Sequence, residues 1–132
     1  MSRRSFFKDL LLAGVTIALP VRASTASHAA VQGKLLQTSP VAGFQYHQGE
    51  SIWAQLSIGV PLQLIREPEN KYDTRAVRIK FQGHKLGYLP RLDNATVSQL
   101  MDRAENLQAY ISGLKTSDDP WQRVEVEVRW MI

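Results

Sequence analysis

The chain has 132 residues, of which 44% are hydrophobic and 21% charged, as in a soluble globular protein of one domain, with or without a tail. This balance excludes a coiled coil, a polytopic membrane protein and a wholly disordered chain. The chain contains no cysteine, which excludes disulfides, thiolate catalysis and cysteine-based zinc sites. Its formal net charge of +4 suggests a nucleic-acid partner until the charges are located along the chain.

The first thirty residues have the pattern of a secretory signal. Arg3 and Arg4 precede an apolar run over residues 10–21 that is too short to cross a bilayer, which needs about 20 residues. Small residues follow, so we predict a signal peptide over residues 1–23, with cleavage as late as 29–30. The arginine pair resembles the bacterial twin-arginine signal. We expect a bacterial protein exported by the export machinery, periplasmic or secreted, with no integral membrane segment in its mature form; a core or surface helix is the alternative.

Removal of residues 1–23 changes the charge argument. This segment holds four of the 16 basic residues and one of the 12 acidic residues, which leaves 12 basic and 11 acidic residues and a net charge of +1. Bulk charge then gives no support for nucleic-acid binding, and only a local patch can supply it. Residues 24–33 are small and polar, which is typical of a flexible tether. Residues 34–132 remain as one domain with a modest core.

The rest of the chain contains short predicted strands separated by tight turns. The strands are predicted, in chain order, at residues 34–38, 62–66, 76–81, 85–89, 108–114 and 124–130. In the third and the last of these, apolar residues alternate with charged ones, as they do in a half-buried strand. The pattern predicts a mainly β fold with one or two short helices: a small antiparallel β-barrel, closed or nearly closed, which leaves few unpaired edges.

One helix is predicted between the fourth and fifth strands. Asp93 or Asn94 begins it and can cap its free N–H groups. A single apolar stripe with helical spacing follows: Val97, Leu100, Met101 and Ala104. A helical turn is also expected between Gly49 and Gly59. The tryptophans are assigned to the core: Trp53, Trp121 and Trp130.

Three segments carry a resemblance to a known family. Residues 66–77 read REPENKYDTRAV, residues 83–91 read GHKLGYLPR, and residues 43–46 read GFQY. In this combination they resemble the HIRAN domain, which stands at the front of some eukaryotic helicase-like DNA-repair proteins and alone in bacteria. The resemblance covers the chain from about Val41 to the last strand. It implies a barrel similar to oligonucleotide-binding (OB) or SH3-like barrels and binding of the 3′-hydroxyl end of single-stranded DNA.

The resemblance also assigns residues to the nucleic-acid site. These are Tyr46, Asn70, Tyr72, Asp73, Tyr88 and Arg91. It implies that an early aromatic ring stacks on a base, that Asp73 accepts a hydrogen bond from the terminal sugar hydroxyl, and that a basic residue near the end of GYLPR holds a phosphate. Members that bind DNA ends have arginine where Gln45 stands and another basic residue where Pro90 stands. A guanidinium fork for phosphate is therefore lost at Gln45.

The chemistry of these residues suits a nucleic-acid end independently of the resemblance. A carboxylate accepts from a sugar hydroxyl and repels a phosphate in the same place, which selects an unphosphorylated end. A tyrosine ring stacks on a base for about 1–3 kcal/mol, with little sequence preference. Further phosphate contacts are predicted from Arg66, Arg75 and Lys85. So few cations predict weak binding, micromolar at best.

Structural interpretations stand beside these functional ones. Asn70 and Asp73 are favoured turn residues, the tyrosines can pack against the barrel, and Arg66 can pair with a surface neighbour. His47 and His84 have no cysteine or suitably spaced carboxylate beside them, so no metal site and no cofactor is predicted.

Two functions follow from the sequence. The first is a non-catalytic nucleic-acid-binding module that prefers single-stranded DNA or free 3′-hydroxyl ends, with a single-stranded nucleic acid or oligonucleotide as its partner. The alternative is an exported interaction or small-ligand-binding module on the same barrel that no longer binds DNA. No catalytic residue is assigned and the protein is not expected to be an enzyme, because the helicase, hydrolase and zinc activities of the larger family proteins belong to other domains.

Overall fold

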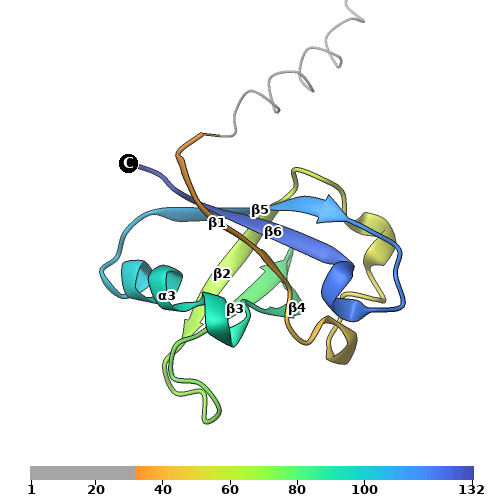
Figure 1. The fold of residues 1–132 in the computed structure, drawn as a ribbon, viewed down its shortest axis with the longest axis horizontal. Coiled ribbons are helices and arrows are strands. Elements are labelled where there is room, and N and C mark those ends of the chain that lie inside the picture. Colours follow the sequence, from red (N-terminus) through yellow and green to blue (C-terminus); the bar gives the residue numbers. More distant parts are fainter. Residues whose placement is uncertain (1–31) are drawn as a thin grey trace, which may run out of the picture. The chain divides into compact units, whose positions relative to one another are not determined.

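A computed structural model of the chain describes residues 32–132 (Figure 1). This part contains six strands and one α-helix: β1 (Lys34–Pro40), β2 (Pro61–Glu67), β3 (Ala76–Phe81), β4 (His84–Tyr88), α3 (Ala95–Asp102), β5 (Leu107–Leu114) and β6 (Val124–Trp130). Short 3₁₀ turns occur at Phe44–Tyr46, Trp53–Gln55, Arg91–Asp93 and Pro120–Gln122. Each predicted strand, the predicted helix and the predicted turn after Gly49 are confirmed, with bounds within about two residues, the usual uncertainty of element ends.

The predicted signal peptide, residues 1–23, lies outside the described residues, and so does all but the end of the predicted tether, residues 24–33. Both assignments, and the expected export, stay predictions. Between residues 32 and 132 no helix has the length and apolar character needed to cross a membrane.

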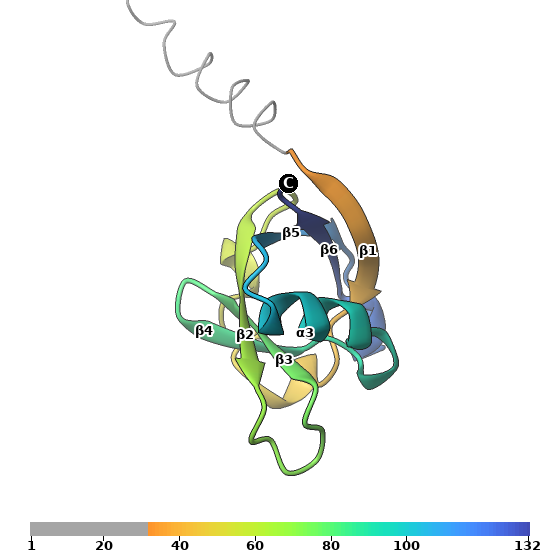
Figure 2. The same cartoon turned by 90° about the vertical axis from the view of Figure 1, so that its left-hand side faces the viewer.

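The strands form one antiparallel sheet in the order β1-β6-β5-β2-β3-β4, which confirms the mainly β class. β5 and β6 pair from Leu107 to Leu114, whereas β2 pairs with β5 only through Pro61 and Leu62 before it continues along β3. The sheet therefore curves, and α3 lies across its open side (Figure 2). It does not close into a complete barrel, because β1 and β4, the two ends of the strand order, share no ladder.

A single bridge joins the two ends of the curved sheet. Ala42, just after β1, exchanges two backbone hydrogen bonds with Tyr88 on β4, with N···O distances of 2.8 and 3.0 Å. Gly87 permits this approach, because a Cβ at this position would collide with the carbonyl oxygen of Ala42 and its φ of 153° is unfavourable for other residues. The segment after β1 is thereby held against β4.

The core fills the concave side of the sheet. Alternation in β3 buries Val77, Ile79 and Phe81, and alternation in β6 buries three valines in the same way. α3 adds Val97 and Leu100, as its apolar stripe predicts, whereas Ala104 lies beyond the helix and is exposed.

The tryptophans only partly follow the core prediction. Trp53 and Trp130 are half-buried. The assignment of Trp121 to the core is wrong: it is 49% exposed, because it lies in the short 3₁₀ turn before β6 and not in a strand that alternates toward the core.

Candidate nucleic-acid interface

Six of the nine predicted binding residues line one pocket beside the loop that joins β2 and β3. This loop projects from the body of the domain at the bottom of Figure 1. The pocket has a volume of about 410 Å³ and is lined by Ala42, His47, Asn70, Tyr72, Asp73, Ala76, Lys85, Tyr88, Leu89 and Arg91. The Ala42–Tyr88 bridge thus brings the segment after β1 to the pocket, which this segment lines together with the β2–β3 loop.

The loop wall of the pocket is shaped by Asn70. Its Oδ1 accepts hydrogen bonds from the backbone N–H groups of Tyr72 (2.8 Å) and Asp73 (3.1 Å), an arrangement typical of asparagine in turns. Its Nδ2 donates to Oε1 of Glu67 at 2.9 Å. The structural interpretation of Asn70 therefore holds, and the same bonds present Tyr72 to solvent, where its side chain is 80% exposed.

Asp73 is the anionic group of this wall. Its Oδ1 accepts from the backbone N–H of Arg75 at 2.9 Å, and its Oδ2 accepts from Nδ2 of Asn94 at 2.7 Å. Burial alone raises the pKa of the Asp73 carboxyl, but these two hydrogen bonds outweigh burial, and the nearby charge of Arg91 acts with them. The pKa lies below its ordinary value, so the side chain is an ionised, pre-oriented acceptor at neutral pH.

The sequence predicts Asn94 as a helix cap, and the structure corrects that role. It stands at the N-cap position of α3, but its side chain makes no hydrogen bond to the helix and reaches Asp73 instead. It is fully buried, and within residues 32–132 its Oδ1 has no hydrogen-bond partner. Sequence reasoning missed Asn94 as a site residue because a cap and a tertiary contact leave the same signal, an asparagine before a helix.

Tyr88 and Lys85, which line the pocket, belong to a polar network on β2, β3 and β4. The hydroxyl of Tyr88 donates to Oε1 of Glu67 at 2.9 Å and accepts from Nζ of Lys85 at 2.9 Å. Arg78 donates to the other oxygen of Glu67. Burial raises the pKa of Glu67, but its hydrogen bonds from Asn70, Tyr88 and Arg78 reverse the shift and leave it below the ordinary value. The network holds the Tyr88 ring in place beside the pocket.

His47 lines the pocket, although sequence reasoning considered it only as a metal ligand. Its ring lies 6.0 Å from that of Tyr88, in an edge-to-face arrangement. Burial lowers the pKa of His47, and the positive charges of Lys85 and Arg78 lower it further. The imidazole is therefore neutral at pH 7 and can accept or donate a hydrogen bond. In the sequence, only its position next to Tyr46 hints at this placement.

Three predicted residues do not line the pocket. Tyr46 is 77% exposed and lies just before His47, so its ring is accessible at the surface next to the pocket. Arg66 instead pairs with Asp102 (2.8 Å) and donates to the carbonyl of Ala76 (3.0 Å). Arg75 is exposed on the loop and contributes its backbone N–H. The ion-pair interpretation of Arg66 thus agrees with its contacts.

Gln45 and Pro90, the two departures from the family pattern, differ in their surroundings. Gln45 is exposed, and Pro90 is buried just before the 3₁₀ turn that carries Arg91. Across residues 32–132, no group of three or more histidine, aspartate or glutamate side chains is placed to hold a metal ion.

Comparison with known proteins identifies the family of the described domain. The family model described as the HIRAN domain matches residues 35–129. A crystal structure of a protein from Lactobacillus plantarum is similar, with 30% sequence identity and a TM-score of 0.63 over 72% of this chain and 91% of that one. The crystal structure of the HIRAN domain of human HLTF is similar in fold, with 18% identity and a TM-score of 0.57 over 74% of this chain and 76% of that one. No curated protein matches the chain.

Proposed function

The chain belongs to the HIRAN domain family, and from this premise we propose that it is a DNA-binding module whose pocket holds the free 3′-hydroxyl end of a single strand. Membership alone suggests DNA binding in general. The preference for a single strand and for a hydroxyl end is our inference from the pocket.

The observation that carries the proposal is the ionised Asp73 in a pocket beside an exposed ring. Two hydrogen bonds hold the carboxylate in place, and its remaining lone pairs can accept from a sugar hydroxyl. A terminal phosphate at the same position would face a fixed negative charge. Tyr72 offers a ring for base stacking, worth about 1–3 kcal/mol, and Arg91 lines the same pocket as a phosphate contact.

We propose binding without catalysis. The lowered pKa of Asp73 makes its carboxylate a poor carrier of protons near pH 7, where general acid–base groups work best. The hydroxyl of Tyr88 is already engaged by Glu67 and Lys85. These contacts support a role in holding a ligand over a role in transforming it.

The affinity should be modest, because several cations near the pocket are missing or engaged. Gln45 and Pro90 carry no charge, and Arg66 is paired with Asp102. For each phosphate of a single strand that the protein leaves without a cation, the slope of log K against log salt is shallower by about 0.7.

Fluorescence anisotropy with one labelled oligonucleotide, ended by a 3′-hydroxyl or a 3′-phosphate, tests the proposal. We expect the hydroxyl end to bind at least about fivefold more tightly, roughly 1 kcal/mol. Tyr72→Ala should weaken both ends by a similar factor, because stacking does not depend on the terminal group. Equal binding of both ends, or no binding at low salt, overturns the proposal.

Export is a separate proposal that rests on the Arg3-Arg4 leader. An exported copy would meet DNA or oligonucleotides outside the cytoplasm; if it binds none, the remaining candidate is an interaction or small-ligand module on the same barrel, favoured by the uncharged Gln45 and Pro90. A reporter fused to the leader should lose export when Arg3→Lys and Arg4→Lys are combined. Continued export of that variant contradicts the twin-arginine assignment.

A further inference from the structure

We propose that the outward face of β3 and β4 carries the strand beyond the pocket, with its phosphates held by a basic strip of Lys85 and Lys80. Arg78 lies on the same face but is paired with Glu67. This inference rests on the proposed function and extends it from the terminal nucleotide to the chain behind it. It specifies a single-stranded polyanion longer than the pocket as the ligand.

The strand register places the strip next to the pocket. Ala76 and Tyr88 line the pocket, and Arg78 lies directly opposite Tyr88 in the β3–β4 pair. Residues 76, 78 and 80 share one face of β3, since Ile79 and Phe81 point into the core. Same-face residues of a strand are about 6.7 Å apart, so Lys80 follows Arg78 along this face, away from the pocket.

The strip leaves a like-charge contact that an anion would relieve. Lys80 and Lys85 are cross-strand partners, and like charges directly opposite each other destabilise a sheet. Lys85 donates to the hydroxyl of Tyr88 and forms no ion pair within residues 32–132. Of the ion pairs within residues 32–132, none involves Lys80. A phosphate between the two ammonium groups would therefore stabilise the face that it binds.

The other direction out of the pocket is less suitable for a polyanion. A second hollow of about 380 Å³ adjoins the pocket at Asn70 and contains the carboxylates of Glu67 and Glu69. Its two arginines are already engaged, Arg66 by Asp102 and Arg78 by Glu67.

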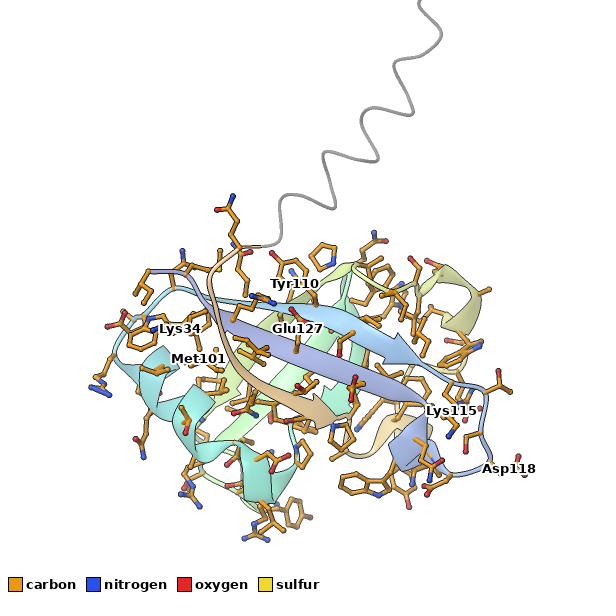
Figure 3. The ribbon with its side chains drawn as sticks, turned by 45° about the horizontal axis from the view of Figure 1, so that its top comes forward. Lys34, Met101, Tyr110, Lys115, Asp118 and Glu127 are labelled. Atoms are coloured by element: carbon orange, nitrogen blue, oxygen red, sulfur yellow. The ribbon has the colours of Figure 1, made fainter. Side chains whose placement is uncertain are left out.

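The opposite half of the sheet also disfavours a polyanion. Its outward residues include Glu125 and Glu127, and Arg129 beside them is already paired with Glu127. Glu127 lies opposite Tyr110 on the face shown in Figure 3. The charge distribution therefore directs the strand along β3 and β4 and away from β5 and β6.

NMR titration of the labelled protein with 3′-hydroxyl oligothymidylates of two and ten nucleotides tests this path. The dinucleotide reports on the pocket alone, and the longer strand reports on the pocket and the strip. We expect the longer strand to bind about tenfold more tightly at low salt and to shift the amide signals of Arg78 and Lys80, which the dinucleotide leaves in place.

Lys80→Glu should weaken binding of the ten-nucleotide strand about fivefold or more, reduce its salt slope by about 0.7, and leave dinucleotide affinity unchanged. The matched control is Lys34→Glu, the same charge change at an exposed position on β1, which should have little effect. The amide spectrum of each variant also shows whether it is folded.

The outcomes separate the two proposals. The proposed role of the strip is contradicted if the longer strand binds no more tightly than the dinucleotide, or if Lys34→Glu and Lys80→Glu weaken binding of the longer strand equally. Neither result contradicts the proposed role of the pocket. If the wild-type protein binds neither oligonucleotide, the proposed function fails and the strip fails with it.

Discussion

The β5–β6 hairpin and the β2–β3–β4 strands follow the same alternation but differ on their outward faces. On β5 and β6 the charged and polar groups satisfy one another: Arg129 pairs with Glu127, and Ser112 donates to Glu125. On β3 and β4, two lysines occupy paired positions of the ladder, and within residues 32–132 neither forms an ion pair.

The two halves of the sheet differ in whether their outward charges are paired within the domain. The hairpin is complete within itself and serves as a scaffold. The other half keeps unbalanced charge, a pocket and a glycine-dependent bridge, and natural proteins concentrate such departures from local rules at functional sites. Matched substitutions in the two halves test this difference.

The largest effect is expected from alanine at the two strand glycines. Gly87→Ala should reduce the free energy of unfolding by about 3 kcal/mol, because its φ is unfavourable and the new Cβ meets the Ala42 carbonyl. Gly113→Ala on β5 should change it by less than about 0.5 kcal/mol, because its Cβ meets only the exposed Glu125 side chain. Urea unfolding measures both variants, and equal losses would remove the contrast between the halves.

The next effect concerns the buried contact behind Asp73. Asn94→Asp places a second carboxyl at hydrogen-bond distance, so the mutual repulsion of the two carboxylates should raise the pKa of the pair and cost about 2–3 kcal/mol at pH 7. Because a raised folded-state pKa favours the protonated form, this loss should shrink as pH falls toward 4.

Asn106→Asp, at an exposed position before β5, is the control and should show no such pH dependence. Stability of the two variants that is alike at every pH between 4 and 7 would show that Asn94 does not act on Asp73.

The smallest effect is expected from His47. Its pKa is lowered, so it is neutral at pH 7 and gains a positive charge only as pH falls through that lowered value. Affinity for single-stranded DNA should then rise about threefold between pH 7 and pH 5.5, because a charge gained beside a bound phosphate strengthens binding.

His47→Gln should flatten this profile, whereas His84→Gln, outside the pocket, should keep it. A profile that His84→Gln flattens and His47→Gln leaves intact would place the titrating group elsewhere.

Much of the fold could be predicted because period-two alternation in β3 and β6 gives an unambiguous strand signal. Whether the sheet closes into a barrel could not be predicted, since closure would require β1 to pair with β4, and this depends on how far the whole sheet curves. The core assignment of Trp121 failed because hydrophobicity alone does not show that a residue lies in a surface turn.

The candidate site also contains residues that the sequence could predict and residues that it could not. Asn70, Tyr72 and Asp73 are adjacent in sequence and occur in a recognisable motif, so they could be named together. Asn94 contacts Asp73 across 21 positions of sequence. His47 reaches the pocket because the Ala42–Tyr88 bridge and the hydrogen bonds between Gln48 and Lys85 hold its segment against β4. Such contacts depend on tertiary structure and leave no local pattern.

The most direct test of the account is the ratio of affinities for hydroxyl-ended and phosphate-ended strands in the wild-type protein and in Asp73→Asn. We predict a ratio of at least about five for the wild type and close to one for the variant, since the amide keeps an acceptor oxygen but loses the charge that repels phosphate. A ratio that Asp73→Asn leaves unchanged would contradict the account.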